Sequence, residues 1–565
     1  MAELRKGVNK PNVVVEIILD SGTVRYGYHA CAAGTVDLLA DGSYFADGAG
    51  YAAGSTDLPQ VIPILKSVSS LQNKLDTRNG YSTRGLLTVV LSGRENFKRL
   101  LQDEYLKNRR AVRRDGFIAS GFTYSDYAST FSGKIQDWSL KGDELTLSIA
   151  DDLVDASAKI PVENTTKTQY LDYRDRNPVD IMLDIMIERL GIDAALVDVA
   201  AFASERDLWL GGWRFSRVIT EPKEANEYLN ELQIETNSFV IHDGDKINYK
   251  VFAPPVPGQE VEHWSDDLHI LEGSLSVKSG YRDNFYNRVV VYLDYDESGA
   301  DREENYETAV IAADASSQSS IEWDEVKTKV IRSRWIRTLA YTDAVNATGV
   351  KIYHASRANG PGAGSLSYES SDCTLKWAAP GGAYGEPVRV SADGRYQLFD
   401  SDKRRYVRVV VVAEELPATS ASDSIALSGL NGEAMASTLA GKLLTRYRDP
   451  VATISLEVDI NNCAHGAQFI KPTDLKDVTT AEAFKKGGGQ WSAERVMLTS
   501  VRPDFSFNRV SVEAIETKMY RRYGFIAPSG YPDYPAAAAT QREYGFIGDN
   551  ANKVGAGGSD GYAVW

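Results

Sequence analysis

The chain has 565 residues, of which 43% are hydrophobic and 25% are charged, a composition typical of a folded globular protein. This length exceeds what one hydrophobic core covers, so we expect roughly three or four domains. With 62 Lys and Arg against 78 Asp and Glu, the formal charge is -16, which opposes tight binding of nucleic acid.

The three cysteines, Cys31, Cys373 and Cys463, lie far apart in the sequence. Their odd number excludes a disulfide framework and a four-cysteine metal cluster within one chain, so we expect buried or idle thiols. The sequence contains no run of about 18 apolar residues, and its start, "MAELRKGVNKPN", lacks the apolar stretch of a signal peptide. We therefore expect a protein that is made in a cytoplasm and stays soluble there.

Residues 1–160 have the pattern of a β-rich domain. In "FSGKIQDWSLKGDELTLSIADDL", Leu145, Leu147 and Ile149 alternate with polar residues after a Lys-Gly-Asp turn, which predicts a half-buried hairpin. β character recurs in "GLLTVVLSG", and "RENFKRLLQDEYL" predicts one short helix.

Residues 161–270 predict an α+β domain because the hydrophobic period changes to that of a helix. In "NPVDIMLDIMIERLGI", Asn177 is the predicted N-cap, Pro178 fits the first turn, and Gly191 ends an apolar helical face. A second helix is predicted in "EPKEANEYLNELQIETN". It leads into a hairpin around Asp243-Gly244-Asp245.

Residues 271–345 and 435–525 predict one further β-rich domain. "NFYNRVVVYLDY", "VATISLEVDI" and "NRVSVEAIETK" have strand patterns, and "EAMASTLAGKLLTRYRDP" predicts a helix stopped by Asp449-Pro450. Between the two halves, residues 346–434 carry short strands separated by Gly, Pro and Asp turns, which indicates an inserted small β-sandwich. The predicted fold class is mainly β with α+β segments, in several domains.

Residues 526–565 predict an extended C-terminal strap, because their Pro, Ala and Gly content cannot build a core. The tetrapeptide Tyr-Gly-Phe-Ile occurs at the start of this segment and again within it. Either the two copies are apolar anchors for self-association, or they recur by chance and pack locally on their own domain. The candidate anchor residues are Tyr523, Phe525, Ile526, Tyr544, Phe546 and Ile547.

Six histidines and three cysteines offer few catalytic pairings. His263 and His269 are six residues apart, which fits no zinc motif, so we expect structural roles for them. "SSDCTLKW" resembles the Asp-Cys start of papain-like cell-wall peptidases. However, Thr374 and Leu375 replace the residues usual after the cysteine, and the next histidine is His465, so we expect a core or edge-strand cysteine.

The acidic segment "DYDESGADREEN" partly matches a calcium-binding loop. Asp294, Asp296 and Ser298 stand at its first, third and fifth positions, but Asn305 replaces the closing Glu and a strand pattern precedes the loop. We expect a solvated acidic loop, with weak calcium binding as the alternative.

One basic segment stands out in an acidic protein, "KRLLQDEYLKNRRAVRRDGF". Without interleaved aromatic residues it fits either contact with DNA phosphates or pairing with acidic surfaces of a neighbouring subunit. Its basic residues are Lys98, Arg99, Lys107, Arg109, Arg110, Arg113 and Arg114. No catalytic residue, cofactor-binding residue or metal ligand is predicted anywhere, so we expect no enzymatic activity and no cofactor.

The order of these features resembles the hub or tail-tip proteins of long-tailed bacteriophages with flexible tails and of gene transfer agents. The resemblance is carried by the hairpin of residues 131–153, the two helices and hairpin of 177–252, the segment "SGYRDNFYNRVVVYLDY", and "RYRDPVATISLEVDI" followed by "RRYGFIAP". It covers most of the chain.

This resemblance implies a virion protein at the tail tip, assembled in the bacterial host cytoplasm, that forms a homotrimer whose β domains close into a ring. The implied partners are the distal tail protein, the tape measure protein, and a central fibre or other tail-tip proteins, with the host surface as a further candidate. Genomic DNA would pass an acidic lumen without specific binding. Some members carry an iron-sulfur cluster, which we do not expect here because the cysteines are lacking.

Two other functions stay open at the level of sequence. A tail-associated cell-wall hydrolase would need a Cys-His or Glu-Asp site in a compact block, and none is evident. A receptor-binding tail protein would act through the inserted β-sandwich of residues 346–434.

Overall fold

Strands dominate the structure, which confirms the predicted mainly β, multidomain fold class. The computed structural model describes residues 11–29, 61–69, 73–76, 81–82, 85–118, 124–162, 170–219, 222–243, 246–255, 261–278, 284–295, 302–319, 325–338, 350–352, 365–369, 374–378, 396–400, 405–412, 425–427, 432–459, 462–463, 470–484, 489–504, 508–517, 545–547 and 562–564.

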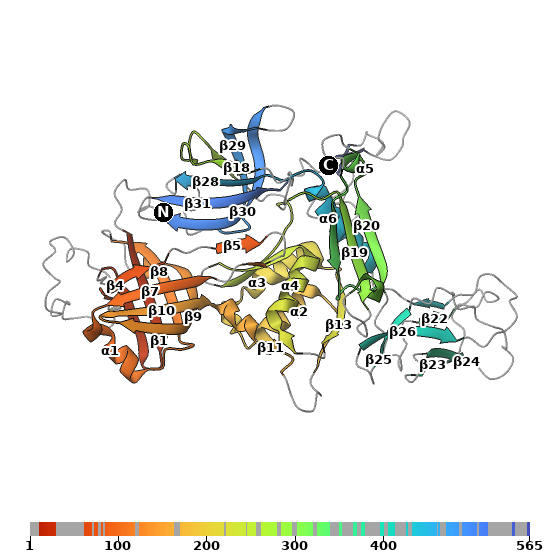
Figure 1. Ribbon diagram of the computed structural model, residues 1–565, viewed down its shortest axis with the longest axis horizontal. Helices are drawn as coiled ribbons and strands as arrows, with labels where there is room; N and C mark the ends of the chain where they lie inside the picture. The colour runs from red at the N-terminus through yellow and green to blue at the C-terminus, as the bar shows by residue number, and fades with distance from the viewer. Residues whose placement is uncertain are drawn as a thin grey trace.

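The first sheet has eight strands in the order β3-β2-β1-β8-β9-β10-β7-β4 (Figure 1). Its terminal strands do not pair with each other in the described part of the chain, so the sheet is not a closed barrel. Helix α1 (Arg94–Asp103) follows β7. The strands are β1 (Pro11–Leu19), β2 (Gly22–Gly27), β3 (Val61–Ile62), β4 (Leu65–Val68), β7 (Leu86–Ser92), β8 (Arg110–Phe117), β9 (Ala128–Lys141) and β10 (Glu144–Asp151).

The predicted hairpin of residues 131–153 is confirmed by the antiparallel pairing of β9 with β10. Leu145, Leu147 and Ile149 are fully buried, because their alternation directs all three side chains to the core face. Gly142 turns the chain between the strands at φ +62°, a left-handed conformation that glycine adopts without a steric penalty.

The central part of the chain holds the two predicted helices. Asn177 caps the first by accepting a hydrogen bond from the Val179 amide at 2.9 Å, and this helix continues as one turn of π-helix. The second helix ends where Asn237 takes a left-handed conformation at φ +51°. The elements are β12 (Leu171–Arg176), α2 (Pro178–Leu183), η4 (Asp184–Arg189), α3 (Val199–Glu205), β13 (Phe215–Ile219), α4 (Ala225–Thr236), β15 (Ser238–His242) and β16 (Ile247–Val251).

A second sheet is built mainly from the C-terminal half, in the order β17-β29-β30-β31-β28-β18. One strand from near the N-terminus, β5 (Asn73–Asp76), crosses over and pairs antiparallel with β30, placing Lys74 opposite Ser500 (Figure 1). Lys74 also forms an ion pair with Glu513 at 3.1 Å. The other strands are β17 (Glu262–Ser265), β18 (Ser276–Lys278), β28 (Thr453–Asp459), β29 (Leu475–Phe484), β30 (Gln490–Asp504) and β31 (Arg509–Glu516).

A three-stranded sheet lies beside these, with β19 (Arg288–Tyr295) between β20 (Tyr306–Ala313) and β21 (Thr328–Arg332). Helix α6 (Gly432–Tyr447) packs against β19 and β20. At the start of this helix, an added Cβ on Gly432 would lie 2.2 Å from the carbonyl oxygen of Arg337. Only glycine therefore allows the helix to approach the 333–338 segment this closely.

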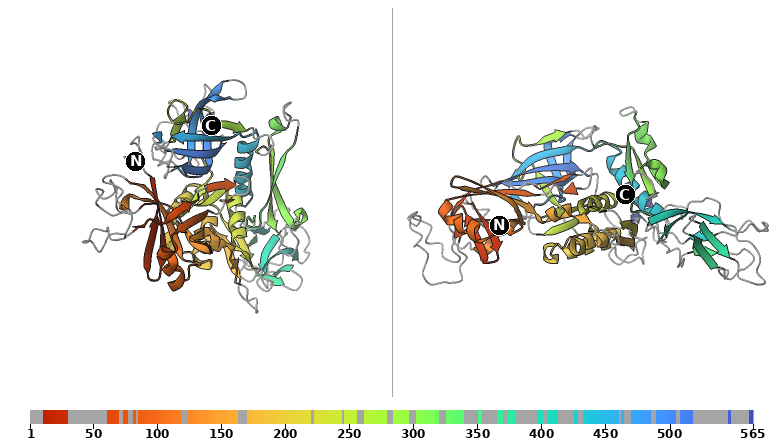
Figure 2. Two further views of the ribbon diagram at one scale, coloured as in Figure 1. Left: turned by 60° about the vertical axis from the view of Figure 1, so that its left-hand side comes forward. Right: turned by 60° about the horizontal axis from the view of Figure 1, so that its bottom comes forward.

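The strands β22 to β27, which are the described parts of the chain between residues 350 and 427, lie apart from the other sheets at one end of the long axis of the molecule (Figures 1 and 2). The strand character predicted for this region is confirmed, and its packing as a sandwich stays a prediction. The four-stranded sheet has the order β23 (Ser365–Glu369), β24 (Thr374–Ala378), β26 (Arg405–Val412) and β25 (Tyr396–Asp400), and a two-stranded sheet joins β22 (Val350–Ile352) to β27 (Ile425–Leu427).

One continuous hydrophobic core connects the middle of the molecule. It includes Val179 of α2, Leu232 of α4, Val291 of β19 and Leu439 of α6, all fully buried. Leu75 of β5 belongs to the same core. The central helices, the three-stranded sheet and α6 are thus held together by shared apolar packing.

Candidate functional site

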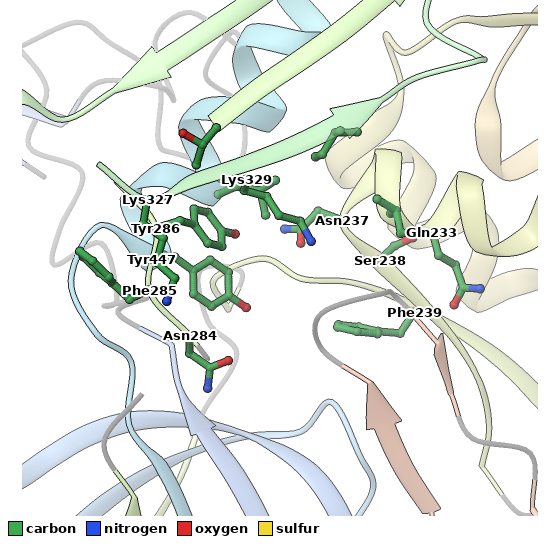
Figure 3. A pocket seen from close by; sticks show the side chains of 14 residues that line it. Gln233, Asn237, Ser238, Phe239, Asn284, Phe285, Tyr286, Lys327, Lys329 and Tyr447 are labelled. Atoms are coloured by element: carbon green, nitrogen blue, oxygen red, sulfur yellow. The ribbon is translucent and has the colours of Figure 1, made fainter. Parts of the chain in front are cut away.

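A cavity of about 230 Å³ lies where α4, β15, β21 and α6 meet (Figure 3). Its wall includes residues from the last turns of both helices, with Gln233 and Asn237 at the end of α4 and Leu443 and Tyr447 at the end of α6. The segment before β19 and the start of β21 complete it. Four stretches far apart in the sequence therefore build one site.

A buried asparagine, Asn287, fixes one side of this cavity. Its amide nitrogen donates to the carbonyl of Glu325 at 2.8 Å, and its amide oxygen accepts from the backbone amide of Lys327 at 3.0 Å. The amide of Tyr286 donates to the carbonyl of Tyr447 at 2.9 Å. These bonds hold the β19 and β21 entry segments and the end of α6 in register around the cavity.

The rings of Tyr286 and Tyr447 pack against each other in the cavity wall, with 4.7 Å between their centroids. Behind them lies Arg446, whose guanidinium carbon is 4.8 Å from the Tyr447 ring centroid and 3.2 Å from that of Phe252. Burial lowers the pKa of this guanidinium. Its Nε and one terminal nitrogen have no hydrogen-bond partner among the described residues.

Several polar groups in the cavity wall also lack a protein partner within the part of the chain that the structure describes. Asn284 is only 7% exposed, yet its side-chain amide makes no hydrogen bond there. The same holds for the hydroxyl groups of Tyr286 and Tyr447, which Figure 3 shows on the side of Asn237 and Phe239. These polar groups line the cavity, so they are available to a ligand or to water.

The described wall of the cavity carries positive charge and no carboxylate. Lys327 and Lys329 both line it and are half-buried. Lys327 also lies over the ring of Phe285, with its ammonium 5.8 Å from the centroid. A cationic concave site stands in contrast to the formal charge of -16 on the whole chain.

A serine, a histidine and an aspartate meet elsewhere, between the first sheet and the central helices. Nε2 of His242 lies 3.4 Å from Oγ of Ser132 and 3.3 Å from Oδ2 of Asp152, and all three side chains are buried. A catalytic triad uses the two ring nitrogens separately, one for the serine and one for the carboxylate. Here a single nitrogen faces both, so the cluster fastens two parts of the fold.

The basic segment predicted as a DNA or subunit contact is largely paired within its own domain. Arg113 makes two hydrogen bonds of 2.8 Å to Asp115, and Arg114 donates to Glu16 at 3.0 Å. The other two arginines described there bond to acidic residues as well, Arg109 to Asp20 and Arg110 to Asp152 at 3.4 Å. Lys98 pairs with Glu95. Lys107 is exposed, and the side chain of Arg99 lies outside the described part.

The partial calcium motif begins with a buried residue. Asp294 is 3% exposed and accepts hydrogen bonds from the amide and hydroxyl of Thr338, at 2.9 and 2.6 Å. Burial raises the pKa of its carboxyl group. Asp294 therefore ties β19 to the 333–338 segment. Asp296, Ser298, Gly299 and Asp301 lie outside the described residues, among which no cluster of metal-ligating side chains occurs.

The described cysteine, Cys463, and the two histidines His263 and His269 contact other residues of the protein. Cys463 is buried, which raises the pKa of its thiol to about 12. His263 bonds to the hydroxyl of Thr479 at 2.7 Å, and Nδ1 of His269 accepts from the amide of Ser265 at 3.3 Å. These contacts agree with the structural roles expected for both histidines. Cys31, Cys373 and His465 lie outside the described part of the chain.

Only part of the second tail anchor is described. Phe546 and Ile547 belong to β32 (Gly545–Ile547), which pairs antiparallel with β33 (Tyr562–Val564) and sets Phe546 opposite Ala563. Tyr523, Phe525, Ile526 and Tyr544 lie outside the described residues. The role of all six as self-association anchors stays a prediction.

No family model and no curated protein matches the chain. Among solved structures, it is similar to the 43 kDa tail protein of prophage MuSo2 from Shewanella oneidensis, at 8% identity and a TM-score of 0.39 over 90% of this chain and 98% of that one. It is also similar to the prophage tail protein gp18 from Listeria monocytogenes EGD-e, at 6% identity and a TM-score of 0.36 over 82% and 93%.

A third similar structure is a chain from the virion of a native gene transfer agent particle, at 11% identity and a TM-score of 0.20. That match covers 31% of this chain and 49% of the other. In the described residues, no helix has the length and apolar character needed to span a membrane.

Proposed function

We propose that this chain is a structural protein of a phage-type tail, the hub that closes the tail tube at its tip, organises tail-tip assembly and forms the conduit for genome delivery. The observation that carries the proposal is where the segments whose sequence resembles hub proteins lie in the fold. These segments form the β9–β10 hairpin, α2, α4 with β15 and β16, β19, and β28. The helices, β15, β16 and β19 share the central core, and Ser132, Asp152 and His242 connect the hairpin to them.

Homotrimer formation is part of the proposal. The first sheet ends in the short strands β3 and β4, and the second in β17 and β18, whose outer edges are unpaired in the described part of the chain. A ring of three copies would cover such edges, which otherwise promote uncontrolled association. The net negative charge suits a channel through which DNA slides without adhering.

The proposed role is not enzymatic. The Ser132, His242 and Asp152 cluster supports this, because it lacks the geometry of a nucleophile with its base and is sealed from solvent. The proposed partners are the distal tail protein, the tape measure protein and a central fibre or other tail-tip proteins, and the proposed location is the tail tip of a virion.

A receptor-binding role through residues 346–434 is the second candidate. The observation that favours it is the position of β22 to β27, which project from one end of the molecule (Figures 1 and 2). A fragment with these residues alone would then bind host cells, and the chain lacking them would still form rings.

Light scattering on the purified full-length chain, followed by negative-stain imaging, tests the hub proposal. The expected result is a particle of three times the chain mass that appears as a ring. A monomer that persists at high protein concentration, and that gold-labelled antibodies do not detect at virion tail tips, would contradict the proposal.

A further inference from the structure

We infer that the cavity between α4, β21 and α6 binds a carboxylate group presented by the acidic side chain of a peptide segment. This inference is independent of the hub proposal, because it depends only on the groups that line the cavity. At about 230 Å³, the cavity is smaller than the roughly 300–1,000 Å³ typical of pockets for drug-sized ligands. It has room for one side chain.

The first argument is hydrogen bonding. The Asn284 amide and the hydroxyls of Tyr286 and Tyr447 have no partner among the described residues, although Asn284 and Tyr447 are 7% and 5% exposed. All three groups can donate a hydrogen bond. Because all three residues line the cavity, an acceptor with two oxygens that binds there can receive hydrogen bonds from several of these donors at once.

The second argument is charge. Lys327 and Lys329 line the cavity, and Arg446 lies directly behind Tyr447 with two guanidinium nitrogens unpaired in the described chain. No described residue of the wall is acidic. Two cations in the wall and a third next to Tyr447 favour an anion over a neutral ligand.

The third argument separates a carboxylate from other ligands. The rings of Tyr286 and Tyr447 pack against each other, with 4.7 Å between their centroids, and their hydroxyl groups lie on the side of Asn237 and Phe239. The last turns of α4 and α6 reach the cavity, and their carbonyl ends carry partial negative charge. Those ends disfavour a doubly charged phosphate more than a singly charged carboxylate.

Isothermal titration of the purified full-length chain tests this inference with three probes. They are N-acetylglutamate N-methylamide, its neutral glutamine counterpart, and inorganic phosphate. We expect saturable binding of the glutamate derivative and at least ~10-fold weaker binding of the other two, because hydrogen bonds to a charged group contribute about 1.5–3 kcal/mol. Equal or tighter binding of the glutamine derivative or of phosphate would overturn the inference, as would no saturable binding of any probe.

Two variants assign the binding to this cavity. Tyr447→Phe removes one hydroxyl but keeps the packed ring, and Lys329→Gln removes one charge at a half-buried position. Each should weaken glutamate binding by ~10-fold. The matched controls Tyr105→Phe and Lys278→Gln change exposed residues outside the cavity and should leave binding unchanged. Unchanged affinity in both folded cavity variants would refute the site.

Discussion

Glu235 on α4 accepts a hydrogen bond from the hydroxyl of Ser333 at 2.5 Å, deep in the central core. The same hydroxyl accepts hydrogen bonds from the amides of Trp335 and Ile336, at 3.2 and 2.8 Å. Burial raises the pKa of Glu235 to about 8, and the nearby charge of Glu231 contributes in the same direction. This carboxyl group is therefore mostly protonated in the folded protein at neutral pH.

The raised pKa makes the stability of the fold depend on pH. In the unfolded chain the Glu235 carboxyl ionises near its ordinary pKa of 4.5, so ionisation favours unfolding increasingly from about pH 4.5 up to about pH 8. We expect Glu235→Gln to raise the free energy of unfolding at pH 8 by on the order of 2 kcal/mol, and to have no such effect at pH 4. Urea unfolding at both pH values measures this.

The control for that experiment is Glu227→Gln, which changes an exposed glutamate on the same helix. It should leave the pH dependence of unfolding as in the unmodified chain. An identical pH profile for Glu235→Gln and the unmodified chain would show that the buried carboxyl does not control this dependence.

Asp152 connects the first sheet to the central helices. Burial opposes ionisation of its carboxyl group, but the hydrogen bond from His242 and the charge of Arg110 outweigh burial and lower its pKa. A lowered pKa stabilises the fold above the unfolded pKa, and this contribution is lost as the pH falls through the folded pKa. We expect Asp152→Asn to cost about 2 kcal/mol of unfolding free energy at pH 7. Asp103→Asn, at an exposed position on α1, is the control.

Gly432 offers a test of close packing. Gly432→Ala would force the start of α6 away from the Arg337 carbonyl, because the new Cβ would lie 2.2 Å from that oxygen. We expect a loss of about 1–3 kcal/mol in denaturant unfolding. In the same helix, an added Cβ on Gly441 meets nothing within 4 Å, so Gly441→Ala should instead stabilise the protein by about 0.5–1 kcal/mol. Similar losses for both variants would contradict this account.

The C-terminal strap can be tested in assembled tails. If Phe546 and Ile547 anchor the tail segment on a neighbouring subunit, deletion of residues 527–565 or the double change Phe546→Ala and Ile547→Ala should lower incorporation of the chain into tails. Exchange of Ala537 and Ala538 for serine should not. Immunoblots of purified particles measure incorporation. Full incorporation of the deletion variant would show that this segment does not anchor the chain on a neighbouring subunit.

Local patterns in the sequence predicted local structure well. Asn177 with Pro178 located the start of α2, and the alternation of Leu145, Leu147 and Ile149 located β10, because capping and periodicity act over a few residues. The π-helical turn after Leu183 was not predicted, because the hydrophobic pattern does not show where an extra residue enters a helical turn.

Contacts between distant segments could not be predicted. His242 contacts Asp152 and Ser132, which lie 90 and 110 residues away in the sequence, so only the folded chain brings the three together. The basic segment looked available for a partner because the acidic residues Glu16 and Asp20, which pair with it, come from another strand and its turn. The cavity groups Asn284, Lys329 and Tyr447 carry no common motif, so no sequence signal could have linked them.

The pairing of β5 with β30 also bears on how the chain is made. Lys74 and its partner Ser500 are more than 400 residues apart, so at about 5–20 residues per second a ribosome needs tens of seconds to supply the partner strand. During that time the first sheet can form, while the edge of β5 that pairs with β30 has no partner strand. The second sheet therefore forms only late in synthesis, and a translation product that ends before β30 cannot complete it.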